Sequence, residues 1–145
     1  MGKFRQSPSP RDTVLAVVAA FAANDQVSLG RLQASFGKLT VENILDAIGS
    51  FGKMMAPAFS DSNVQNRVRG AVASELSEQQ MTPEARETAQ AITISLLTVA
   101  EPTSSMALMA KHADVMREQS AQVVMGSVMA TSRVVSDLGV KLNFR

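Results

Sequence analysis

The sequence predicts an all-α protein, an irregular five- to six-helix bundle with a long C-terminal helix and extended terminal arms. Apolar residues recur at steps of three and four along several segments, as one face of a helix requires. Serine, threonine, aspartate and proline stand where these segments begin, which is typical of first helical turns. Strand-forming blocks of β-branched and aromatic residues are not apparent. We therefore expect a basic N-terminal arm over residues 1–9, a helical domain over residues 10–138 and a tail over residues 139–145.

The composition excludes several classes of protein and site. The chain has 145 residues, 46% of them hydrophobic, with 14 basic and 13 acidic side chains. Its small net charge gives no overall attraction to nucleic acid or anionic lipid. The absence of cysteine excludes disulfides and thiolate metal sites. No run reaches the ~18 apolar residues of a membrane span.

The N-terminal region also bears on localisation. The apolar stretch Val14–Ala23 follows Lys3 and Arg5, which is the charge order of a signal peptide. The segment Ser7–Asp12 between them contains two prolines and an acid, which argues against cleavage. We expect a soluble chain, in the cytoplasm or within an assembled particle, rather than one secreted by a cleaved signal.

The first helix is expected to be capped by Ser9, to open at Pro10 and to run to about Ala23. Its apolar residues cover most of the circumference: Val14, Leu15, Val17, Val18 and Phe21. Such a helix must be buried, either in its own domain or against a neighbouring subunit.

Two shorter helices follow. Ser28 is placed to cap a helix over Leu29–Phe36, and Thr40 is placed to cap the next one. Gly49 and Gly52 are expected to loosen the end of this third helix.

The middle of the chain contains a connector and two further helices. Met54–Phe59 is expected to be an apolar connector, which Pro57 interrupts. Asp61 should cap a helix that runs to about Leu76. After a polar loop, Thr82–Ala100 is expected to be the central helix, because it starts polar and ends apolar over most of its circumference.

The last helical segment leaves two alternatives open. Read as one helix, residues 102–138 would be about 55 Å long. The alternative is a bend or break at Gly126, because glycine weakens a helix interior. Gly139 is a natural C-terminal stop.

Catalytic and metal-binding chemistry is the least supported function. The one histidine, His112, is expected on a helix surface or rim, without a partner to orient it as a general base. The carboxylate pairs Glu42/Asp46 and Asp114/Glu118 are expected to be solvated helix faces. We therefore expect no cofactor, no metal and no enzymatic activity.

The leading hypothesis is a non-enzymatic structural subunit that self-associates into an oligomer, filament, shell, or phage- or secretion-type particle. Its partners would be copies of itself or other protein subunits, met through apolar helix faces and the terminal arms. The residues assigned to self-association are Val17, Phe21, Val124, Val128, Val135, Leu138, Leu142 and Phe144.

The alternative is a small DNA-binding adaptor. Residues 28–50 are expected to form a helix, a turn and a second helix, the order of a helix-turn-helix. Glu42 and Asp46 on the second helix would face the phosphates and weigh against it. Five cations are candidates for phosphate contacts that do not read sequence: Lys3, Arg5, Arg11, Arg67 and Arg69.

Overall fold

The computed structural model describes residues 9–98, 107 and 110–140. Within these residues the chain forms seven helices and no strand, which confirms the all-α prediction. The helices are α1 (Pro10–Ala22), α2 (Gln26–Gly37), α3 (Val41–Met54), α4 (Ala56–Phe59), α5 (Ser62–Glu78), α6 (Pro83–Leu97) and α8 (Ala113–Leu138). The terminal arms lie outside the described residues, apart from Ser9 and the first residues of the tail.

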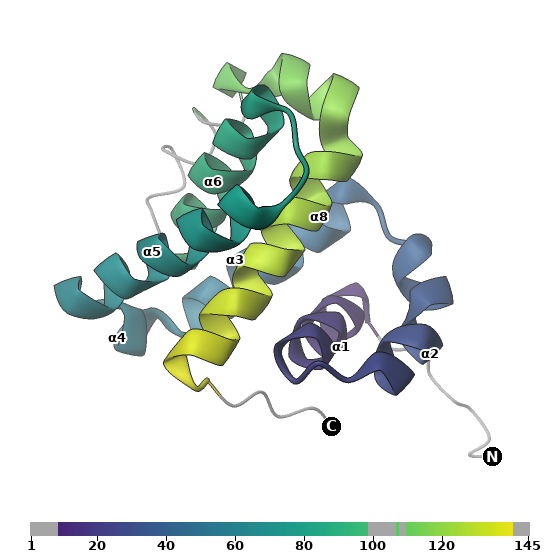
Figure 1. Cartoon of the computed structure of the whole chain (residues 1–145), viewed down its shortest axis with the longest axis horizontal. Coiled ribbons are helices and arrows are strands. Elements are labelled where there is room, and N and C mark those ends of the chain that lie inside the picture. Colours follow the sequence, from purple (N-terminus) through teal and green to yellow (C-terminus); the bar gives the residue numbers. More distant parts are fainter. Residues whose placement is uncertain (1–8, 99–106, 108–109, 141–145) are drawn as a thin grey trace.

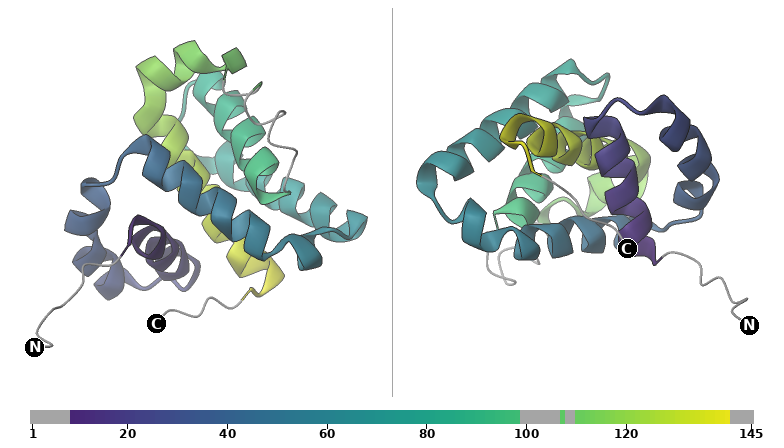
Figure 2. Two further views of the ribbon diagram at one scale, coloured as in Figure 1. Left: turned by 180° about the vertical axis from the view of Figure 1, so that it is seen from behind. Right: turned by 90° about the horizontal axis from the view of Figure 1, so that it is seen from below.

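Helix α8 runs through the middle of the bundle and packs against α1, α3, α5 and α6 (Figure 1). From behind, α3 crosses in front of α8 (Figure 2). The expected central helix, α6, is also well buried and packs against α3, α5 and α8. The α8 helix takes the central place because its second half is lined with small and β-branched side chains that let neighbours approach from several sides.

Four of the expected helix starts are confirmed by their caps. Ser9 accepts a hydrogen bond from the backbone N–H of Asp12, and Thr82 accepts one from that of Ala85, each at 3.1 Å. Thr40 forms a capping box with Asn43, and Asp61 accepts from the first turn of α5. The C-terminal stop at Gly139 is also confirmed, by its left-handed φ of 65°.

The prediction that Ser28 caps the second helix was wrong. Asp25, not Ser28, is the N-cap, so α2 begins at Gln26. The Asp25 carboxylate accepts hydrogen bonds from the Ser28 hydroxyl at 2.7 Å and from the Ser28 backbone N–H at 3.1 Å. Aspartate ranks with serine as a cap, and Ser28 instead lies at the position that the cap satisfies.

This cap makes the stability of α2 depend on pH. The hydrogen bond from the Ser28 side chain, followed by that from its backbone, lowers the pKa of Asp25 from its usual 3.8. The cap is therefore fully present above the unfolded-state pKa and is lost as the pH falls through the folded-state pKa. We expect the Ser28 amide NMR signal to titrate with a midpoint below 3.8. Asp25→Asn, which keeps an acceptor and removes the titration, should abolish the transition; a midpoint at or above the usual value contradicts the assigned cap.

Two glycines expected to weaken helices are instead points of close packing. A Cβ on Gly52 would lie 2.1 Å from the Leu96 carbonyl oxygen, so α3 and α6 meet there backbone to backbone. A Cβ on Gly126 would lie 2.9 Å from Met81 Cε. The α3 helix continues to Met54, and α8 passes through Gly126 without a break. The departure from helical backbone in α8 falls at Gln119, with φ −130°.

Polar contacts join α6 and its N-cap residue, Thr82, to α8. Thr93 donates a buried hydrogen bond to Ser127 at 2.8 Å, and the Thr82 hydroxyl bonds the side-chain oxygen of Gln119. The Thr82 backbone N–H donates to Gln122 at 3.1 Å. These contacts hold α8 against α6 at the irregular backbone of Gln119 and on its C-terminal side.

The expected connector over Met54–Phe59 contains a short helix. Pro57 lies in the first turn of α4, where its missing N–H costs little, and therefore does not interrupt the helix. The Phe59 ring is buried and meets Phe51 edge-on, with ring centroids 6.2 Å apart. Phe59 thus anchors α4 to α3.

Candidate self-association surface

Four of the residues assigned to self-association lie in the core of the chain itself. Val17, Val124, Val128 and Val135 are buried, because α1 packs directly against α8 and their apolar faces cover one another. These side chains cannot meet another copy without unpacking the fold, so their assignment to a contact surface is corrected. Phe21 and Leu138 are half-buried against the same core. Leu142 and Phe144 lie outside the described residues.

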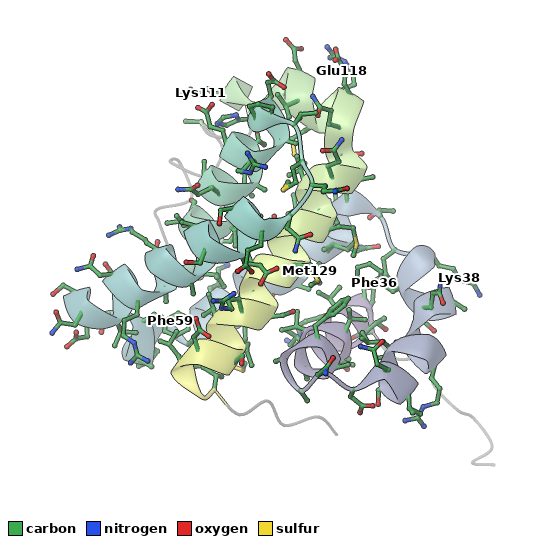
Figure 3. The ribbon with its side chains drawn as sticks, in the orientation of Figure 1. Phe36, Lys38, Phe59, Lys111, Glu118 and Met129 are labelled. Carbon is green, nitrogen blue, oxygen red and sulfur yellow. The ribbon has the colours of Figure 1, made fainter. Side chains whose placement is uncertain are left out.

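Helix α2 is the most peripheral helix of the bundle (Figure 1). It has 12 residues, none of them buried. Its inner side, with Leu29, Leu32 and Phe36, is half-buried against the core, and Figure 3 shows Lys38 on the outer side. Val27 is 73% exposed. Within the described residues the other exposed large apolar side chains, Met54 and Met125, lie on different helices. These are single side chains and not a patch, so helix faces offer little contact surface.

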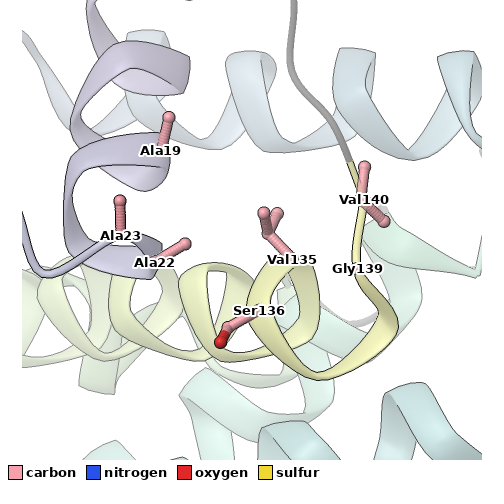
Figure 4. A pocket seen from close by; sticks show the side chains of 7 residues that line it. All are labelled: Ala19, Ala22, Ala23, Val135, Ser136, Gly139 and Val140. Atoms are coloured by element: carbon pink, nitrogen blue, oxygen red, sulfur yellow. The ribbon is translucent and has the colours of Figure 1, made fainter.

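An open hollow lies between the C-terminal ends of α1 and α8 (Figure 4). Its volume is about 340 Å³. The lining residues are Ala19, Ala22, Ala23, Val135, Ser136, Gly139 and Val140. The hollow exists because the end of α1 carries only methyl groups where it faces α8. The hollow could not be predicted from the sequence, since these alanines resemble any other part of a buried helix.

The two helix ends that meet at the hollow differ in charge: no cation is found in the last turn of α1, whereas at the end of α8 Arg67 donates to the Asp137 carbonyl at 3.2 Å. The last turns of α1 and α8 contain no basic residue. The C-terminus of a helix carries a partial negative charge, which a nearby cation stabilises. The hollow therefore combines a small apolar floor with a slightly negative rim on its α1 side.

Formal charge is divided unevenly between the body of the chain and its ends. All 13 carboxylates and 10 of the 14 basic residues lie between residues 9 and 140, which gives this body a net charge of −3. The ends carry the other 4 cations and no carboxylate. These cations are Lys3, Arg5, Lys141 and Arg145.

Several cations of the body are held by their own neighbours. Arg133 contacts Asp137 at 3.1 Å and Glu75 and Glu78 at 3.4 Å, which links α8 to α5. The hydrogen bond to Asp137 is the largest cause that raises the pKa of Arg133. Arg86 donates to the carbonyls of Leu76, Gln79 and Met81 at the end of α5.

The cations assigned to phosphate contacts do not share one site. Arg11 is exposed on α1, 3.9 Å from Asp12. Arg67 and Arg69 are exposed on α5, and Arg67 donates to the Asp137 carbonyl at 3.2 Å. Lys3 and Arg5 lie outside the described residues. The described three thus do not form one group, because Arg11 lies on α1 and the other two on α5.

The expected helix-turn-helix consists of α2, a turn and α3. The would-be recognition helix, α3, packs against α1, α6 and α8. Its exposed side carries Glu42 and Asp46, and Asn43 is occupied in the capping box with Thr40. This surface suits phosphate contacts poorly.

The expectation that His112 lies at a helix surface or rim was wrong. The side chain is 8% exposed, and its Nδ1 lies 2.8 Å from the buried Thr88 hydroxyl. This partner could not be predicted, because Thr88 belongs to α6 and only folding brings the two residues together. Of the two carboxylate pairs, Glu42, Asp46, Asp114 and Glu118 are all exposed, and Asp114 forms an ion pair with Arg117 at 2.6 Å.

Neither a metal site, nor a membrane-spanning helix, nor a similar protein indicates a function for the described part of the chain. Within the described part of the chain, no three histidine or carboxylate side chains are grouped so that they could hold a metal ion. None of the helices in those residues combines the length and apolar character needed to cross a membrane. Comparison of the chain with protein-family models, with curated proteins and with solved structures finds no match.

Proposed function

We propose that the protein is a non-enzymatic structural subunit that associates with copies of itself through its terminal arms. The single observation that supports this proposal best is the division of charge. The body carries a net charge of −3, whereas the ends carry 4 cations without a carboxylate. Two whole chains attract each other little, but the arm of one chain is attracted to the body of another.

The helix faces play a smaller part in this proposal than the arms. The apolar faces of α1 and α8 are already covered within one chain. What remains for contact between copies is therefore the arms and the surfaces they reach. The assembled form would be an oligomer, filament, shell, or phage- or secretion-type particle.

The experiment compares two variants that remove the same charge. In the first, Lys3, Arg5, Lys141 and Arg145 are all changed to glutamine. In the matched control, four exposed cations of the body are changed to glutamine: Lys38, Lys53, Arg69 and Lys111. We expect light scattering after size exclusion to show at least tenfold weaker self-association for the arm variant only. Equal weakening in both variants would contradict a role for the arms.

The alternative function, a helix-turn-helix adaptor over residues 28–50, has less support because α3 is packed on three sides and exposes acids. It is tested by binding to duplex DNA at increasing salt. A DNA-binding surface of this kind should lose affinity in Lys38→Glu and Lys53→Glu, since each removes a cation near the phosphates. Affinity that is absent at low salt, or unchanged in both variants, removes this alternative.

A further inference from the structure

We infer that the hollow between the ends of α1 and α8 receives the C-terminal tail, residues 141–145, of a second copy of this chain. The inference rests on the proposed function and names the place where one arm meets its partner. Three properties carry it: the shape of the hollow, the pattern of the tail and the charge of both.

The hollow has room for apolar side chains. Ala19, Ala22 and Ala23 of the α1 end lie across the space from Val135 and Ser136 of α8 (Figure 4). Its volume of about 340 Å³ lies at the lower end of the ~300–1,000 Å³ of sites that bind small molecules. That space suits one or two side chains and is too small for a helix.

The tail has the pattern of a segment with two apolar anchors. Leu142 and Phe144 alternate with Lys141, Asn143 and Arg145. In an extended segment alternate side chains share a face, so the two apolar side chains would lie together, ~7 Å apart. Pockets for alternate side chains are a common way to bind an extended peptide.

The charges of the tail and the hollow complement each other. The end of α1 at the hollow has no basic residue in its last turn, whereas the end of α8 already receives a hydrogen bond from Arg67. Lys141 or Arg145 of an incoming tail would supply the cation that the α1 end lacks. The body that carries the hollow is itself negative overall.

The occupant is assigned to a second copy because of what association requires. Val140, from which the tail continues, is itself part of the wall of the hollow. A tail that filled its own hollow would use both halves of the contact within one chain and leave none for a neighbour. A tail placed in the next copy leaves one free tail and one free hollow, so the contact is head-to-tail and can be repeated.

Variants of two kinds test the two halves of this contact, the tail and the hollow, separately. Leu142→Ser with Phe144→Ser removes the anchors and keeps the hollow. Ala22→Lys places a long cation in the hollow and keeps the tail; Ala23→Lys, at an exposed position, repeats this test with less risk to folding. The matched control is Ala34→Lys, at an exposed position on α2. Thermal unfolding followed by circular dichroism verifies that every variant is folded.

We expect the tail variant and each hollow variant, taken alone, to self-associate at least tenfold more weakly than the unsubstituted chain. The control Ala34→Lys should self-associate as strongly as the unsubstituted chain. A mixture of the tail variant with a hollow variant should form a dimer and nothing larger, because one supplies only a hollow and the other only a tail. Hollow variants that associate normally would overturn this inference and leave the proposed function standing. A mixture that stays monomeric also overturns it, because the tail then binds its own hollow or another surface. An unsubstituted chain that does not associate defeats the proposed function itself.

Discussion

Changing Gly52 to alanine is expected to destabilise the protein by about 3 kcal/mol. The new Cβ would lie 2.1 Å from the Leu96 carbonyl oxygen and 3.1 Å from Leu97 Cα. Both neighbours are backbone atoms of α6, so no side chain can rotate away, and α3 and α6 must separate. Urea unfolding should show a lower midpoint with an unchanged slope.

Gly70→Ala is the matched control for this substitution. Gly70 lies in the interior of α5, and a Cβ there would have no atom within 4 Å. Alanine is favoured over glycine in a helix interior, so this change should stabilise the protein by about 1 kcal/mol. The same chemical change is therefore expected to have opposite signs at two positions. Equal effects at both would contradict the close approach of α3 and α6.

Changing Phe59 to alanine is expected to cost about 3–5 kcal/mol. Phe59 is 2% exposed, and its ring packs edge-on against Phe51 at 6.2 Å. The α4 helix has only 4 residues, too few to hold it in place by its own hydrogen bonds. Loss of this ring leaves a cavity and releases the connection between α3 and α5. Thermal or urea unfolding measures the change.

Met54→Ala, at the other end of the same apolar segment, serves as the control. Met54 is 59% exposed, so its truncation should change the free energy of unfolding by less than about 0.5 kcal/mol. A large effect at Met54 with a small one at Phe59 would mean that the segment packs with its opposite side inward.

Features determined by neighbours in the chain could be predicted from the sequence. Thr40 and Asn43, like Thr82 and Ala85, are three residues apart, so their capping contacts follow from local geometry alone. The cap of α2 was misplaced because Asp25 and Ser28 both suit the position. Local chemistry did not rank one above the other.

Features determined by distant contacts could not be predicted. A glycine in a helix can be a weak point or a place of close approach. Only the position of α6 shows that Gly52 is a place of close approach. His112 meets Thr88 across 24 positions of sequence. The apolar circumference of α1 correctly indicated burial, yet the sequence did not reveal that α2, α3 and α8 of the same chain cover it.

Of the candidate site, the tail pattern could be predicted because it depends on neighbours in the chain, whereas the hollow depends on distant contacts. The alternating pattern of Val140, Leu142 and Phe144 is visible in the sequence, and the proposal that this segment makes a contact rests on it. The hollow is not, because its empty space depends on how the end of α8 is placed beside the alanines of α1.

Sedimentation equilibrium of the unsubstituted chain tests the central claim most directly. If basic arms bind the acidic bodies of other copies, the average mass should rise above the 15.4 kDa of one chain as concentration increases. It should fall again when salt is raised from about 0.1 M to about 1 M, where charges are screened within ~3 Å. A mass that stays at 15.4 kDa throughout, at low salt and at the highest concentration reached, would contradict self-association through the arms.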